Sequence, residues 1–178
     1  MSSRDGAASF LCRTTAPAVV AALMLLSACT VQPVYGPTPS GAAVPSVLSS
    51  IAVDPVDRRT TQVVRNEVLF DLNGGAQPAN PVYRMKLVST TNETALGITR
   101  EDSAPVYSLT VAATYEVSKV SNGEIVLRAT SRGTASFTRV NQAFANIRAR
   151  KDAEETAARA AADDIRIRLA AAAARGVI

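Results

Sequence analysis

The chain has 178 residues, with 19 lysines and arginines, 15 aspartates and glutamates and a formal net charge of +4. This length suits one domain, and the small net charge excludes a typical nucleic-acid-binding protein. The chain has no histidine and only two cysteines, which excludes Ser-His-Asp and Cys-His catalysis and the usual zinc sites. We therefore expect no nucleic-acid partner, no bound metal and no enzymatic activity.

Residues 1–28 have the features of a lipoprotein signal peptide. Positive charge precedes an apolar run at residues 16–26, which is shorter than the membrane span of about 20 residues. The run ends in Leu26-Ser27-Ala28-Cys29, the processing signal of a bacterial lipoprotein. We predict that a diacylglycerol thioether forms on the Cys29 sulfur and that cleavage before Cys29 leaves a lipidated N-terminus. The alternatives are a plain signal-peptidase site after Ala28 and an uncleaved anchor.

The predicted lipid anchor defines the compartment. Each buried CH₂ contributes about 0.8 kcal/mol and one acyl chain alone binds only marginally, so the several chains of a processed lipoprotein hold it firmly on a membrane. Thr30 follows Cys29. In many Gram-negative bacteria an aspartate at that position retains a lipoprotein at the inner membrane, so Thr30 favours the outer membrane. Cys12 leaves with the signal and lipid consumes Cys29, so no intramolecular disulfide can form.

Residues 29–49 are predicted to be the lipidated N-terminus and a proline-rich tether. Prolines at positions 33, 37, 39 and 45 argue against a helix there, and small polar residues fill the rest. Residues 50–178 are predicted to form a single domain. This domain opens with a short apolar stretch at residues 50–53, which predicts a strand.

A helix is predicted over residues 57–72. Val64, Val68 and Leu72 recur at i, i+4 and i+8 and place one apolar stripe on this helix. Asp57 or Thr60 can cap its start, and the glycine pair after Asn73 stops it. That glycine pair has no neighbouring lysine followed by serine or threonine, so it is not a phosphate-binding loop, and we expect no cofactor.

The apolar period changes from 3.6 to 2 after the helix. Apolar and polar side chains alternate from Tyr83 to Leu87 and again at residues 107–118, which predicts strands with one dry and one wet face. Asn122-Gly123 is a strong hairpin signal, and a return strand follows at residues 125–137. We place the dry face of the return strand at Ile125, Leu127, Ala129, Ala135 and Phe137.

The last element is a long alanine-rich helix predicted over residues 150–175. Its acidic residues are interpreted as the solvated side. The elements follow in the order strand, helix, three strands, helix. This order predicts an α+β fold, a two-layer sandwich with two helices packed on one face of a roughly four-stranded antiparallel or mixed sheet. The stripe of the last helix consists of Ala158, Ala161, Ile165, Leu169 and Ala172.

Four stretches along the mature chain match a known pattern, namely Gln32-Pro33-Val34-Tyr35-Gly36, Arg65-Asn66-Glu67-Val68-Leu69-Phe70, Tyr107-Ser108-Leu109, and Asp152-Ala153-Glu154 followed by Ile165 and Leu169. In this order they resemble the lipopolysaccharide-assembly lipoprotein family LptE. No single stretch is specific, but the combination is. Thr30-Val31 departs from the Gly-Phe that is usual in the family.

The resemblance implies a role without catalysis. LptE-like proteins sit as a plug inside the large LptD β-barrel of the outer membrane, assist its assembly and help deliver lipopolysaccharide to the outer leaflet. Contact with lipopolysaccharide through basic residues is implied as well. Two alternatives are an accessory lipoprotein of a lipid-trafficking ABC transporter and an outer-membrane lipoprotein enzyme such as a cell-wall hydrolase. The missing histidine and mature thiol argue against the enzyme.

Four basic residues form the candidate contact with lipopolysaccharide or the barrel. By strand parity, Arg84 and Lys86 point away from the apolar face of their strand, and Arg128 and Arg132 do the same on the return strand. Arginine offers forked donors to phosphate, so this face suits a phosphorylated sugar or a polar barrel lumen. The alternative is an ordinary solvated sheet face, where arginine and threonine are common.

Overall fold

The computed structural model describes residues 43–96 and 105–178. The predicted signal peptide, the lipidation site Cys29 and most of the predicted tether lie outside these residues. The described elements are α2 (Val44–Leu48), β1 (Ile51–Val53), α3 (Arg59–Asn73), β2 (Tyr83–Ala95), β3 (Val106–Lys119), β4 (Ile125–Thr138) and α4 (Ala143–Ala174).

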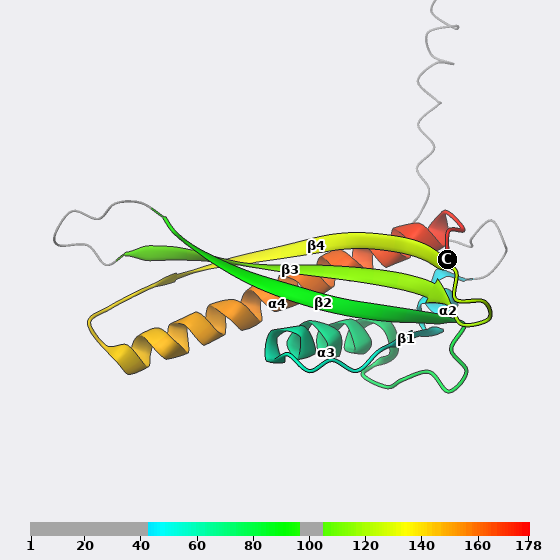
Figure 1. Cartoon of the computed structure of the whole chain (residues 1–178), viewed down its shortest axis with the longest axis horizontal. Coiled ribbons are helices and arrows are strands. Elements are labelled where there is room, and N and C mark those ends of the chain that lie inside the picture. The colour runs from blue at the N-terminus through cyan, green and yellow to red at the C-terminus, as the bar shows by residue number, and fades with distance from the viewer. Residues whose placement is uncertain (1–42, 97–104) are drawn as a thin grey trace, which may run out of the picture. The chain divides into compact units, whose positions relative to one another are not determined.

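The four strands form one sheet in the order β1-β2-β3-β4. Strand β1 runs parallel to β2, and the other neighbours are antiparallel. Helices α3 and α4 lie on the same face of this sheet (Figure 1). The predicted α+β architecture, with helices on one face of a four-stranded mixed sheet, is therefore confirmed. In the described part of the chain, no helix is both long enough and apolar enough to cross a membrane.

Alternating apolar side chains build the buried face of the sheet, as predicted. Met85 and Leu87 of β2 are buried beneath the helices. Strand β3 buries every second side chain along most of its length, because its odd-numbered residues all point to the helical layer. The buried side chains of β3 are Leu109, Val111, Ala113, Tyr115 and Val117.

The prediction for the start of β4 is wrong at one residue. Ile125 is 48% exposed, although its odd number suggested the dry face. Val117 lies opposite Leu127, but Ser118 lies opposite Ile125, so β4 carries one extra residue at this point. A bulge of this kind shifts the alternation by one position and turns Ile125 to the other face.

Helix α2 corrects the expectation that prolines keep the tether free of helix. Pro45 occupies the first turn of α2, where a proline ring is tolerated because the missing N–H would have no helical partner. Val44 and Leu48, four residues apart, are both buried in the core. Packing therefore begins before residue 50 within the described chain.

Helix α3 keeps its predicted stripe but not its predicted cap. Val64 and Val68 are fully buried, and Gly74 ends the helix in the left-handed conformation with φ +64°. The N-cap is Arg58, which makes no side-chain capping bond. Thr60 lies inside the helix, and its hydroxyl donates to a Glu154 carboxylate oxygen of α4. The predicted caps at Asp57 and Thr60 are thus wrong.

Small residues allow α4 to approach the sheet closely. The stripe predicted for this helix is buried, and it faces Gly133 of β4. A Cβ on Gly133 would lie 2.0 Å from the Ala157 carbonyl oxygen and 2.6 Å from the Ala161 nitrogen. Only a glycine beneath an alanine stripe permits this backbone-to-backbone contact. The helix also begins earlier than predicted, at Ala143.

Ion pairs show that α3 and α4 run parallel, because partner numbers rise together along both helices. Some of these pairs use acidic residues of α4, so the prediction that these residues form a solvated side holds only in part. Asp152 and Asp163 are exposed, whereas Glu155 binds a neighbouring helix. The interhelical pairs are Arg59–Glu155 at 2.5 Å, Glu67–Arg159 at 3.1 Å and Asp71–Arg166 at 3.7 Å.

Candidate binding surface on the open face of the sheet

All four predicted basic residues lie on the sheet face opposite the helices, which we call the open face. Arg84 and Lys86 are exposed on β2, and Arg128 and Arg132 are exposed on β4. The residues next to these cations along each strand point the opposite way, toward α3 and α4. Figure 1 shows this face of the sheet without a covering helix. Strand parity thus predicted the placement of these residues correctly.

The strand register places an acidic residue between two of these cations. Glu116 of β3 lies opposite Lys86 of β2 on one side and opposite Arg128 of β4 on the other. Arg128 Nη2 lies 2.7 Å from Glu116 Oε1. The sequence analysis did not identify Glu116 as a partner of these cations, because its position becomes clear only when the register of all three strands is known. The hairpin signal at Asn122-Gly123 was the only available guide to that register.

A second cation of the set is also ion-paired. Arg84 Nη1 lies 3.5 Å from Asp54 Oδ1, and Asp54 directly follows β1. Both ion pairs are partly exposed, so each contributes only about 0–1 kcal/mol to stability. Each pair engages one nitrogen of the guanidinium and neutralises much of its charge. Within residues 43–96 and 105–178, Lys86 and Arg132 have no ion pair.

Threonine hydroxyls surround Arg132. Thr130 and Thr134 precede and follow it on the same face of β4, and each is hydrogen-bonded across to β3. The residue opposite Arg132 is the small Ala112, so no long side chain of β3 reaches over the guanidinium from that position. The distances are 3.1 Å for Thr110–Thr134 and 2.9 Å for Thr114–Thr130, measured between hydroxyl oxygens.

The side chains of the open face include groups that can form hydrogen bonds with an anion or another polar surface. A guanidinium without a carboxylate partner, set among hydroxyls, can donate a fork of hydrogen bonds to a phosphate or to carbonyl and hydroxyl oxygens. Val88, which is 60% exposed, adds an apolar point on the same face opposite Thr114. Among the described residues, no group of three or more acidic or cysteine side chains could hold a metal ion.

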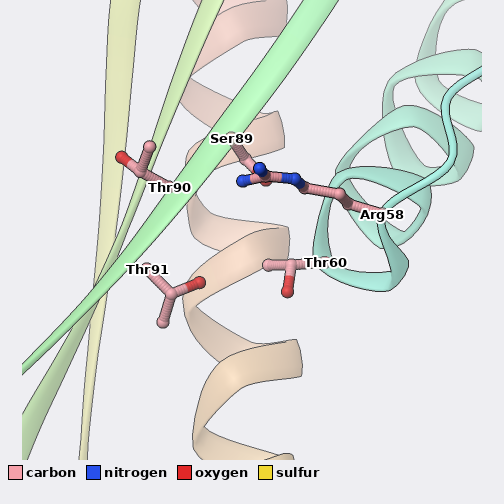
Figure 2. A pocket seen from close by; sticks show the side chains of 5 residues that line it. All are labelled: Arg58, Thr60, Ser89, Thr90 and Thr91. Carbon is pink, nitrogen blue, oxygen red and sulfur yellow. The ribbon is translucent and has the colours of Figure 1, made fainter.

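A separate polar pocket of about 330 Å³ lies between the start of α3 and β2. Its residues come together only when α3 packs on β2, so the sequence did not reveal it. Figure 2 shows Arg58 extending from α3 toward Ser89 on β2. Thr60, which lines the pocket, donates to the Glu154 carboxylate. The pocket therefore borders a negative charge as well as the positive charge of Arg58, and this arrangement does not favour an anion. The lining residues are Arg58, Thr60, Ser89, Thr90 and Thr91.

Comparisons with known proteins identify the fold but not a family. No protein-family model matches the chain, and no curated protein sequence matches it. A candidate lipoprotein from Caulobacter crescentus CB15 is similar in structure, with a TM-score of 0.58 and 24% identity over 72% of this chain and 93% of that chain. A minor lipoprotein from Acinetobacter baumannii has a TM-score of 0.53 and 12% identity over 68% of this chain and 88% of that chain.

A third solved structure is more distant. The rare lipoprotein B from Shewanella oneidensis has a TM-score of 0.43 and 16% identity over 68% of this chain and 86% of that chain, too low to indicate a shared fold. The first two structures show that the chain shares its fold with proteins described as bacterial lipoproteins.

Proposed function

We propose that this chain is an outer-membrane lipoprotein that plugs an LptD-type β-barrel, helps to assemble it, and assists lipopolysaccharide transport to and insertion in the outer leaflet. The observation that carries the proposal is the open face, where Lys86 and Arg132 have no ion pair with any described residue and threonines flank Arg132. The predicted lipidation signal at Cys29 and the fold shared with proteins described as lipoproteins support it. The proposed role requires no catalytic group.

The chemistry of the open face agrees with both proposed contacts. The lumen of an outer-membrane barrel is polar, and the hydroxyls and cations of the open face can form hydrogen bonds with such a wall. Lipopolysaccharide carries phosphates, which arginine binds through parallel hydrogen bonds. The donors of Lys86 and Arg132 are available for these contacts, whereas Arg84 and Arg128 already have carboxylate partners.

The test is affinity purification of the tagged protein from solubilised outer membranes, with barrel and lipopolysaccharide both quantified. We expect a stoichiometric large β-barrel partner. We expect K86Q/R132Q to retain the barrel but at least about tenfold less lipopolysaccharide, since a hydrogen bond to a charged group contributes about 1.5–3 kcal/mol. The matched control is R84Q/R128Q, which removes the same charge from ion-paired positions and should lose much less.

Two outcomes would contradict the proposal. Recovery of inner-membrane transporter subunits in place of a barrel would support an accessory lipoprotein of a lipid-trafficking ABC transporter. Equal lipopolysaccharide on the two double variants would show that the free cations of the open face do not make the contact. Circular dichroism of both variants checks that they fold, which is expected because all four side chains are exposed.

A further inference from the structure

The first turns of α4 leave their apolar side chains uncovered. Phe144 is 79% exposed and Ile147 is 67% exposed. Both lie before Ala153, the first buried residue of this helix. Figure 1 shows these turns at the end of the folded unit that is far from α2. Val140, just before the helix, is 46% exposed as well. Large apolar side chains grouped in this way mark a binding surface more often than isolated ones do.

Two cations share the face of α4 that carries Phe144 and Ile147. Arg148 follows Phe144 by four residues and Lys151 follows Ile147 by four, and this spacing places all four side chains on one side of the helix. In the described chain neither cation has an ion pair. We call the group formed by Val140, Phe144, Ile147, Arg148 and Lys151 the α4 tip.

The neighbouring charges leave the α4 tip net positive. Arg150 points to the other side of the helix, where its Nε lies 2.9 Å from Glu93 Oε2. Glu155 is bound by Arg59. The exposed Asp152 is then the only nearby carboxylate without an ion pair in the described chain, against the two free cations Arg148 and Lys151. An occupant with negative charge therefore complements this surface, and a second copy of the same surface does not.

The order of these residues along the helix axis fits a lipid surface. Arg148 follows Phe144 by one turn, which is about 6 Å at about 1.5 Å per residue. Interfacial helices bury apolar side chains about 5–10 Å into the boundary between headgroups and acyl chains. Phe144 and Ile147 can thus enter this boundary, while the long stems of Arg148 and Lys151 carry their charged groups to the level of the phosphates.

We propose that the α4 tip inserts into an anionic phospholipid surface, with Phe144 and Ile147 among the acyl chains and Arg148 and Lys151 at the phosphates. This contact is separate from the open face of the sheet, and it does not depend on a barrel partner. The predicted lipid anchor at Cys29 would keep the chain at a membrane, so the tip needs only a weak contact of its own to engage a lipid surface.

The absence of tryptophan from the chain allows a direct test. F144W introduces a single tryptophan in the α4 tip, and the full protein is reconstituted in phosphatidylcholine vesicles with or without phosphatidylglycerol. With phosphatidylglycerol we expect the emission to shift to shorter wavelength and brominated lipids to quench it. The matched control is F70W, at the 65% exposed Phe70 of α3, which should emit as a water-exposed residue in both vesicles.

The charges are tested in the F144W background. Each basic residue near an anionic surface contributes about fivefold to binding, so R148Q/K151Q should weaken insertion by about thirtyfold and abolish the shift. R84Q/R128Q, at two cations outside the tip that already have carboxylate partners, should leave the shift unchanged. Tryptophan emission of the F144W protein that is the same in both vesicles, and that iodide still quenches, would overturn the proposal. A shift that depends on protein concentration without vesicles, or appears only with a bound barrel, would also overturn it.

Discussion

Gly133 is a residue at which the sheet and α4 approach each other closely. Because a Cβ there would meet the backbone of α4 at 2.0 Å, the neighbour that must move is a helix and not the end of a flexible side chain. Such a shift also disturbs the buried alanines on both sides of the contact. The tight fit explains why α4 needs its small-residue stripe.

We predict that Gly133→Ala lowers the free energy of unfolding by about 1–3 kcal/mol, the usual cost of overpacking a well-packed core. Thermal or urea unfolding followed by circular dichroism measures this change. The matched control is Gly123→Ala, where nothing lies within 4 Å and only the positive φ of +72° opposes a side chain. If Gly133→Ala costs no more than Gly123→Ala, the close approach of α4 to β4 is not a determinant of stability.

Two buried hydroxyls lie near this contact. Tyr115 of β3 and Ser131 of β4 are fully buried, and neither hydroxyl has a hydrogen-bond partner at bonding geometry in the described chain. Burial raises the pKa of Tyr115, and the nearby Ser131 hydroxyl partly offsets this effect. Because the folded state holds the tyrosine proton more tightly, this group contributes stability below its ordinary pKa that is lost as the pH rises toward the raised value.

At the scale of elements, features that depend on residues within one helix or strand were predicted correctly. Features that depend on how elements pair or pack were not. The stripe of α3 and its stop at Gly74 follow from spacing and glycine geometry within one element. The exposure of Ile125 follows from a bulge that only the pairing with β3 reveals. The placement of Lys86 and Arg132 needed only strand parity. Their lack of an ion pair within the described chain depends on where Glu116 lies across three strands.

Helix α2 was missed for a related reason. A five-residue helix offers only one pair of apolar residues, Val44 and Leu48, and its surroundings are rich in proline. Isolated helices this short are unstable in water, so α2 exists only through its packing on α3 and α4. Sequence periodicity cannot detect an element that owes its stability to other parts of the fold.

This account of α2 can be tested at Leu48, which is 6% exposed. We predict that Leu48→Ala lowers the free energy of unfolding by about 2 kcal/mol, the lower end of the range for buried leucines because the site lies at the margin of the core. Ser46→Ala, on the exposed side of the same helix, should have little effect. Urea unfolding of both variants gives the comparison. Equal stability of both variants and the wild type would show that residues 44–48 belong to the tether after all.

At the scale of the whole molecule, the proposed roles of the open face and of the α4 tip both require the chain to reside at a membrane. The apolar run and the sequence Leu26-Ser27-Ala28-Cys29 predict this attachment. A lipid on Cys29 would place the anchor at the N-terminal end of the tether. The folded part would then be free to meet a barrel through the open face and a lipid surface through the α4 tip.

The last prediction concerns that anchor. Intact-mass spectrometry of the native protein should show a chain that begins at Cys29 and carries acyl groups, because cleavage follows attachment of the diacylglycerol thioether. Cys29→Ser removes the sulfur that accepts the lipid, so this variant should retain residues 1–28 and gain no acyl mass. Thr30→Ser, which leaves the acceptor in place, should be processed like the wild type. An unacylated Cys29 in the native protein, or a wild-type chain that keeps its first 28 residues, would remove the membrane attachment on which the barrel role depends. The stability predictions at Gly133 and Leu48 would be unaffected, since they depend only on packing within the folded part.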